Sequence, residues 1–218
     1  MRADARKNRD HLLAIADAVI AEQGADVSMR DLARRAEVGL ATLLRHFPTR
    51  DALLDALLRA GFDELTALAD RLEARLPPGE ALKAWLRDFV ACAHTYRGAV
   101  TTMMGAIEDP DSALHASCVA MRGSGARLLE RAQSAGQART DLTGPDLFAL
   151  GGALIWLHDQ PTSAPRADHL LDVVVAAILT PQKPQARPRE RGRAHGENPT
   201  HSASRHSGDT GPTPLPSG

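Results

Sequence analysis

Hydrophobic side chains recur at helical spacing from the start of the chain. Residues 9–23 carry them at positions i, i+1, i+4, i+7 and i+8, which is the stripe of one amphipathic helix, formed by Leu12, Leu13, Ala16, Val19 and Ile20. Gly24 follows as a stop signal. Ser28 and Asp31 form a variant of the capping box, which predicts a short helix over residues 28–36. A second short helix is expected over residues 40–47, ahead of Pro48.

Longer apolar stripes follow these two short helices. Thr49 is a typical N-cap for a long helix that continues to the Pro-Pro-Gly breaker at residues 77–79. Further helices are predicted over about 80–94, 96–107 and 112–135, the last interrupted in composition by Gly123 and Gly125. Thr143 and Asp146 have the spacing of another capped helix start. The sequence therefore predicts an all-α fold.

The last two predicted helices, over 147–157 and 170–179, are apolar almost all round. A helix without a polar face must be covered on all sides, either by a second subunit or within its own chain. The rest of the body is too small to enclose both helices, which favours coverage by a second subunit. The sequence therefore predicts a homodimer. Its interface is then expected at Leu147, Leu150, Gly151, Leu154, Leu171, Val174 and Ile178.

Composition changes sharply at residue 180. The last 39 residues are rich in Pro, Gly, Ser, Arg and His, and Leu215 is their only large aliphatic side chain. Such a segment cannot bury enough apolar surface to offset the entropy of ordering, so residues 180–218 are predicted to be a disordered tail.

Charge and cysteine content narrow the classes of function. The formal net charge is −1, so any binding to nucleic acid must come from a local patch. Such a patch lies between residues 28 and 50, a segment that contains five arginines and only two acids. The two cysteines, Cys92 and Cys118, are far apart and predict neither a disulfide framework nor a zinc site. With no signal-peptide core and no membrane-length apolar run, a soluble cytoplasmic protein is expected.

The order of residues in this patch is more specific than its charge. Residues 27–54 read VSMRDLARRAEVGLATLLRHFPTRDALL. This stretch resembles the DNA-binding domain of the TetR family almost position by position, and the resemblance extends over residues 9 to about 60. It implies a three-helix, helix-turn-helix head (1–52), a helical body for effector binding and dimerisation (53–179), and then the tail (180–218). The implied function is a transcriptional regulator, a repressor that a small-molecule effector releases from a palindromic DNA operator.

The second short helix is expected to enter the major groove of DNA. Thr42 lies near its start, where a hydroxyl can meet a base edge or a phosphate, and Leu40 and Ala41 suit thymine methyl groups. Arg45 is expected to face a phosphate or solvent. His46 matches a family histidine that contacts the DNA backbone.

Three neighbouring positions, Arg30, Leu44 and Arg50, complete the expected interface. Arg50, beside the capped start of the long helix, favours a phosphate, and Arg30 can reach a base or the backbone. Leu44 replaces the usual family Tyr, so one phosphate contact is missing. Glu37 stands where the family often has Gly, which predicts a left-handed backbone at a non-glycine residue.

The effector pocket is expected inside the body, under the long helix. Its candidate walls are Trp85, Phe89, Cys92, Met103, Met104, Ile107, Cys118, Met121 and Trp156, with His94, Tyr96 and His158 as polar anchors. Each apolar member of this set suits an ordinary core equally well.

Alternative functions remain open at this stage. An activator or effector-independent DNA-binding protein fits the same head. A helical enzyme or ligand carrier with a vestigial head fits the body, although GxSxG, HExxH and P-loop motifs are missing from the sequence, and no cofactor or metal is expected. His115 and Cys118 share a predicted helix face, and a surface histidine beside a buried cysteine accounts for them.

Overall fold

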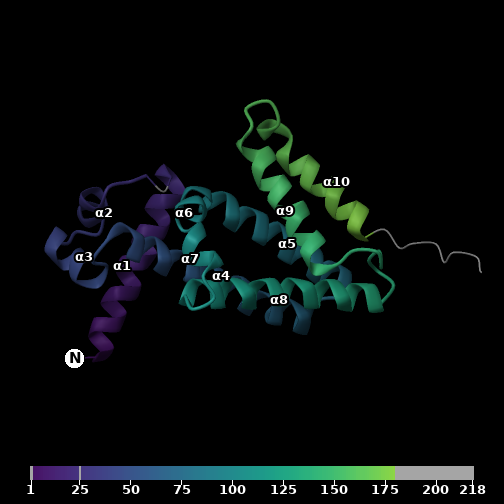
Figure 1. Ribbon diagram of the computed structural model, residues 1–218, viewed down its shortest axis with the longest axis horizontal. Coiled ribbons are helices and arrows are strands. Elements are labelled where there is room, and N and C mark those ends of the chain that lie inside the picture. Colours follow the sequence, from purple (N-terminus) through teal and green to yellow (C-terminus); the bar gives the residue numbers. More distant parts are fainter. Residues whose placement is uncertain (1, 25, 180–218) are drawn as a thin grey trace, which may run out of the picture. The chain divides into compact units, whose positions relative to one another are not determined.

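The computed structural model describes residues 2–24 and 26–179, and Figure 1 shows that they are arranged as helices joined by short connections. The predicted tail lies outside the described residues. The elements in chain order are α1 (Arg2–Gln23), α2 (Met29–Arg35), α3 (Leu40–His46), α4 (Arg50–Arg75), α5 (Pro78–Thr95), α6 (Arg97–Thr102), α7 (Met104–Glu108), α8 (Ala113–Ser134), α9 (Gly144–Asp159), the 3₁₀ turn η1 (Ala164–Arg166) and α10 (Ala167–Leu179). The all-α prediction is confirmed for this part of the chain.

Local capping chemistry sets the ends of the first helices. Gly24 has φ +84°, so α1 ends where a left-handed backbone is needed. Ser28 Oγ accepts a hydrogen bond from the Asp31 amide at 3.1 Å and donates to the Asp31 carboxylate at 2.6 Å, which fixes the start of α2. Glu37, in the turn before α3, has φ +56°. The predicted left-handed residue is therefore confirmed.

The long helix α4 begins at a capped residue and joins two parts of the molecule. Thr49 Oγ1 accepts from the Ala52 amide at 3.0 Å, as its position predicted. With 26 residues, α4 is about 39 Å long. It contacts α1, α5 and α8, and its residues belong to both apolar clusters of the molecule.

The middle of the chain departs from the predicted elements at one point. A single helix was expected over 96–107, but Met103 lies at φ −95°, ψ 10°, and separates α6 from α7. The helix predicted over 112–135 is continuous as α8 despite its glycines. Gly125 is required there, because a Cβ at this position would lie 2.5 Å from the Trp85 ring. The glycine marks close packing instead of a helix break.

The apolar core consists of two clusters. The first joins α1, α2 and α3 to the start of α4, and also takes Ala99 from α6 and Leu114 from α8. The second fills the body, with Trp85, Phe89 and Leu154 among its members. The described residues nevertheless belong to one compact unit. The predicted head–body boundary at 52/53 lies inside α4, but the buried residues from Leu53 to Leu58 still belong to the first cluster. The second cluster takes its buried α4 residues from Leu65 onward.

Helices α9 and α10 are buried on one side only. A capping box starts α9 as predicted, with the Thr143 amide donating to Asp146 at 2.9 Å. Five residues predicted at a dimer interface face the chain's own core instead, which corrects that assignment: Leu147, Gly151, Leu154, Leu171 and Ile178. The other two, Leu150 and Val174, are half-buried against the same core. The reason is register: the uniform apolarity of these helices gave no sign of which side packs inward.

The opposite sides of α9 and α10 are exposed. Trp156 is 61% exposed and Val173 is 51% exposed. Ala149, Gly152, Ala153 and Ala177 are exposed on the same helices. We call these six residues the C-terminal stripe. None of the described helices is long and apolar enough to cross a membrane.

Candidate nucleic-acid interface and ligand cleft

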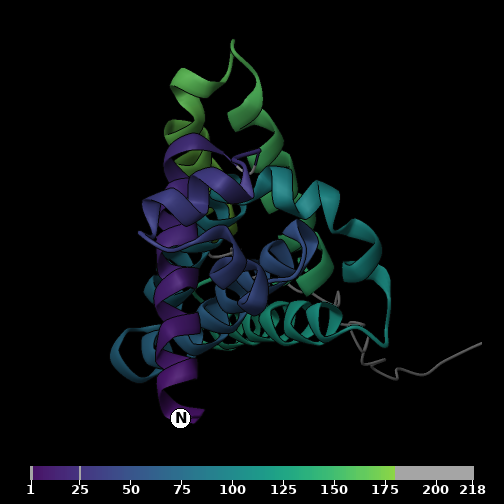
Figure 2. The ribbon, with the colours of Figure 1, turned by 90° about the vertical axis from the view of Figure 1, so that its left-hand side faces the viewer.

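Helix α3 presents short side chains on one side and anchors itself with the other. Ala41 and Arg45 are exposed, and Leu44 is 36% exposed. Leu43 and Phe47 are 1% exposed and hold α3 against the head core. Figure 2 shows α2 and α3 beside α1. A short helix with small outward side chains is the form that fits a major groove.

The remaining predicted groove residues of α3 are partly covered. Thr42 and His46 are half-buried. Leu40 is likewise half-buried and packs against the head core, so it is less accessible than the exposed Ala41. Contact of these two side chains with thymine methyl groups stays a prediction.

His46 is held by the first helix. The Asn8 side-chain amide lies 3.3 Å from His46 Nε2. This contact ties the imidazole at the end of α3 to α1.

The arginines of the head divide into paired and unpaired ones. Arg34 pairs with Asp31 at 2.7 Å, Arg35 with Glu22 at 2.9 Å and Arg50 with Asp26 at 3.2 Å. These pairs are exposed and screened by solvent, so a phosphate can replace the carboxylate.

Arg30 and Arg45 are exposed, and among the described residues no hydrogen bond or ion pair engages them. The sequence alone did not distinguish these two from the paired arginines. They are the cations most readily available for DNA phosphates.

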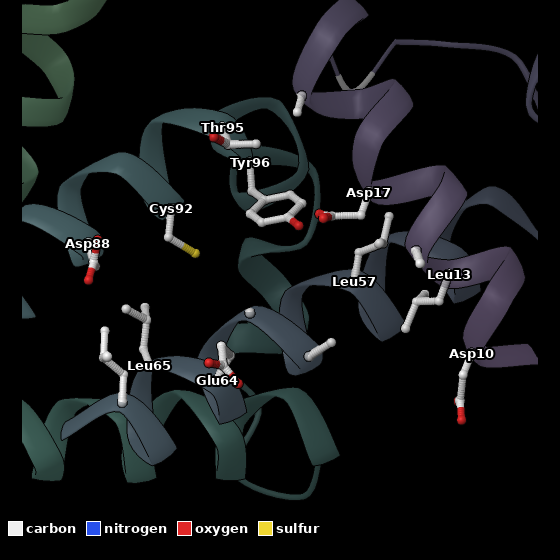
Figure 3. A pocket seen from close by; sticks show the side chains of 15 residues that line it. Asp10, Leu13, Asp17, Leu57, Glu64, Leu65, Asp88, Cys92, Thr95 and Tyr96 are labelled. Carbon is white, nitrogen blue, oxygen red and sulfur yellow. The ribbon is translucent and has the colours of Figure 1, made fainter. Parts of the chain in front are cut away.

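A cleft of about 780 Å³ lies where the head meets the body (Figure 3). Three helices each give one stripe of residues to it. The residues from α1 are Asp10, Leu13, Ala14, Asp17 and Ala21; those from α4 are Leu57, Ala60, Gly61, Glu64, Leu65 and Leu68; and α5 with its C-cap contributes Asp88, Cys92, Thr95 and Tyr96. This volume suits a small organic ligand.

The polar groups of the cleft influence one another. In Figure 3 the Asp17 carboxylate and the Tyr96 hydroxyl point toward each other. Partial desolvation raises the pKa of the Asp17 carboxyl. Burial raises the pKa of the Cys92 thiol to about 11, and the negative charges of Asp17 and Asp88 contribute to the shift. At neutral pH the Cys92 thiol therefore stays protonated.

The cleft differs from the pocket that the sequence predicted. Of the twelve expected residues, only Cys92 and Tyr96 line it. A neighbouring cavity of about 10 Å³, which Phe89 also lines, is too small for an organic ligand.

The expected interior pocket is filled by aromatic rings. Trp85 stacks on Phe89 with ring centroids 5.4 Å apart, and its Nε1 donates to the Leu65 carbonyl at 2.9 Å. Phe148 meets both rings edge-on.

The other expected pocket residues are dispersed. Cys118 and Met121 are buried in the body core, while Met103 and Ile107 pack at core edges. Met104 and Trp156 are 42% and 61% exposed, respectively. His94 and His158 lie together, with ring centroids 4.2 Å apart, away from the cleft.

His115 and Cys118, the pair that the sequence places on one helix face, have structural roles. His115 Nδ1 lies 2.8 Å from the Ile107 carbonyl oxygen, and Cys118 is buried. Burial raises the pKa of the Cys118 thiol, so it is not an activated nucleophile. Among the described residues, no group of three or more His, Cys, Asp or Glu side chains could hold a metal ion.

Two family models match the chain. The model of the bacterial regulatory proteins, tetR family, matches residues 12–57. The model of the transcriptional regulator SbtR-like C-terminal domain matches residues 77–178. No curated protein sequence matches the chain.

Solved structures give the same result over more of the chain. TetR transcriptional regulator SCO0520 from Streptomyces coelicolor is 33% identical with a TM-score of 0.65, and the match covers 80% of this chain and 99% of that one. A TetR regulatory protein from Mycobacterium vanbaalenii is 30% identical with a TM-score of 0.61, over 82% and 99%. RolR, solved in complex with resorcinol, shares the fold at 21% identity and a TM-score of 0.54, over 84% and 92%. Head, long helix and body thus all agree: the chain is a DNA-binding transcriptional regulator of the TetR family.

Proposed function

We propose that this protein represses transcription as a homodimer bound to a palindromic operator, and that a small molecule in the cleft releases it. The observation that carries the proposal is the composition of the cleft walls. One wall is α1 of the head, and the others are α4 and α5 of the body. An occupant that contacts both favours one position of the head over others, and this differential contact is what shifts an equilibrium between states.

The C-terminal stripe supports the homodimer. A contiguous set of small and aromatic side chains on two adjacent helices is exposed in the single chain. Such a surface is costly in water, and small residues allow two helix pairs to approach closely. Isologous pairing of α9 and α10 with their counterparts would place two copies of α3 for the half-sites of one palindrome.

The structural relatives support control by a small molecule. RolR has this fold and was solved with resorcinol, a small aromatic compound. The cleft here combines apolar and polar walls at the junction of head and body.

A DNA-binding assay on full-length protein tests the proposal. Duplexes recovered by repeated selection from a random pool are labelled, and their affinity is measured by fluorescence anisotropy across a salt series. A groove-binding dimer weakens steeply as salt rises, because each phosphate contact releases counterions. We expect the Thr42→Ala/His46→Ala variant to lose about 10-fold or more in affinity, since two groove-side contacts disappear.

The matched control is Thr140→Ala/Thr162→Ala, which removes two exposed threonine hydroxyls outside the head. It should bind as the parent protein does. Equal affinity of the parent and the Thr42→Ala/His46→Ala variant would refute docking through α3.

A further inference from the structure

We propose that the cleft between α1, α4 and α5 binds an organic cation with an apolar body. This inference rests on the proposed function, in which the occupant of the cleft controls DNA binding. It adds the chemical class of that occupant, and it follows from the distribution of charge and apolar surface around the cleft.

The apolar part of the cleft is continuous along the long helix. Leu57, Leu65 and Leu68 line it from α4, and Leu13 lines it from α1. Gly61 allows the α5 side to approach, because a Cβ there would lie 3.3 Å from Cys92 Sγ and 3.5 Å from the Tyr96 ring. A ligand that lies along this surface removes apolar area from water, so its body must itself be apolar.

The charged part of the cleft has one sign. Its lining includes four carboxylates, those of Asp10, Asp17, Glu64 and Asp88, and no Lys, Arg or His. Glu64 is neutralised by Arg71 at 2.6 Å. No hydrogen bond or ion pair with a described residue engages the other three carboxylates. Three exposed carboxylates with no partner among the described residues therefore line a space large enough for a ligand.

The carboxylates lie on two different walls. Figure 3 shows Asp10 and Asp17 on α1, and Asp88 on α5 across the opening. A positive group placed between the walls is attracted by both, whereas an anion is repelled by both. The partial desolvation of Asp17, which raises the pKa of its carboxyl, is a cost that a bound cation offsets.

Cation binding also fits the coupling between the cleft and the head. A ligand held by Asp17 and Asp88 links the first helix of the head directly to α5 of the body. A cation between the two walls is attracted by both carboxylates, whereas an anion is not.

Two probes of the same shape and opposite charge test the inference. Tetraphenylphosphonium is a permanent lipophilic cation, and tetraphenylborate is its anionic counterpart. Titration of full-length protein by calorimetry should give a dissociation constant for the cation at least about 10-fold lower than for the anion. Equal affinities, or tighter binding of the anion, would overturn the inference.

Variants locate the binding and isolate the charge. Asp17→Asn/Asp88→Asn should weaken tetraphenylphosphonium binding about 10-fold and leave tetraphenylborate binding unchanged or tighter. Asp63→Asn/Glu130→Gln removes two exposed acids outside the cleft and should leave both affinities unchanged. If both double variants bind the cation alike, the cleft carboxylates are not the site and the inference fails.

A cleft-filling variant gives a test independent of charge. Ala60→Trp on α4 places a large ring in the opening and keeps every carboxylate, so the cation should bind about 10-fold more weakly or not at all. Circular dichroism shows whether this variant is folded. If it is not, the charge variants alone decide.

Anisotropy with the selected duplex separates this inference from the proposed function. Cation binding that does not release DNA supports the ligand class and contradicts ligand-controlled repression. DNA binding with no preference for the cation over the anion contradicts the ligand class and leaves DNA recognition intact.

Discussion

Replacing Gly125 by alanine should destabilise the body, although alanine is the better helix former. Gly125 lies inside α8, where a new Cβ would lie 2.5 Å from Trp85 Cη2, 2.7 Å from Trp85 Cζ3 and 3.0 Å from Phe148 Cζ. The Trp85 ring cannot easily retreat. It is fully buried, stacks on Phe89 and donates to the Leu65 carbonyl. The added methyl group must therefore distort the core.

The size of the effect follows from two opposing contributions. Gly to Ala in a helix interior stabilises by about 0.5–1 kcal/mol. Overpacking a well-filled core costs about 1–3 kcal/mol. Because the obstructing ring is rigid, we expect the upper part of that range and a net loss of about 2 kcal/mol. In a protein of this size the loss lowers the melting temperature by about 4–8 °C.

Gly123 provides the matched control two residues earlier on α8. It is exposed and has nothing within 4 Å of an added Cβ, so only the helix contribution applies. Gly123→Ala should raise the melting temperature by about 1–4 °C. Both variants are compared with the parent by calorimetry at one protomer concentration, since association shifts apparent stability. A Gly125→Ala protein as stable as Gly123→Ala would show that the packing of the Trp85 cluster is wrong.

Three further predictions concern the interface, the cleft and the subunit contact. Leu44→Tyr should tighten binding to the selected duplex about 2- to 10-fold in anisotropy, because the phenol can donate to a phosphate, whereas Leu44→Phe should not tighten it. An equal gain in affinity for both variants would show that the hydroxyl makes no such contact. In a Cys118→Ser background, the rate of Cys92 alkylation by iodoacetamide should rise with pH, with a midpoint near the raised pKa of about 11. A midpoint near the ordinary thiol pKa would contradict the burial of that sulfur. Trp156→Glu should convert the dimer to a monomer in sedimentation experiments, while Leu76→Glu, at a 39% exposed site outside the C-terminal stripe, should not; an unchanged dimer would move the interface elsewhere.

The helices and their caps were largely predictable because their signals are local. Ser28, Thr49 and Thr143 each accept a hydrogen bond from an amide three residues onward, as their positions indicated. The left-handed Glu37 was predictable from a family position that usually holds glycine. These features need only a few neighbouring residues to be recognised.

Burial and pairing depended on contacts between distant segments. Nothing in the sequence near Asp17 shows that α1 faces α5, so the acids of the cleft were missed. Apolar side chains surround α9 completely, and periodicity could not indicate that Leu154 packs inward while Trp156 is exposed. The expected interior pocket differs from the observed cleft for the same reason: helical spacing of aromatic residues fits a filled core and a cavity wall equally well.

The central claim is that two copies of this chain read one operator through α3. Selection from a random duplex pool by the purified full-length protein, followed by sequencing and determination of the mass of the complex, tests it most directly. We predict enrichment of an inverted repeat, with half-site centres about one helical turn of DNA or more apart, bound by an even number of protomers. Recovery of no common sequence, or of a single half-site bound by one protomer, would contradict the claim.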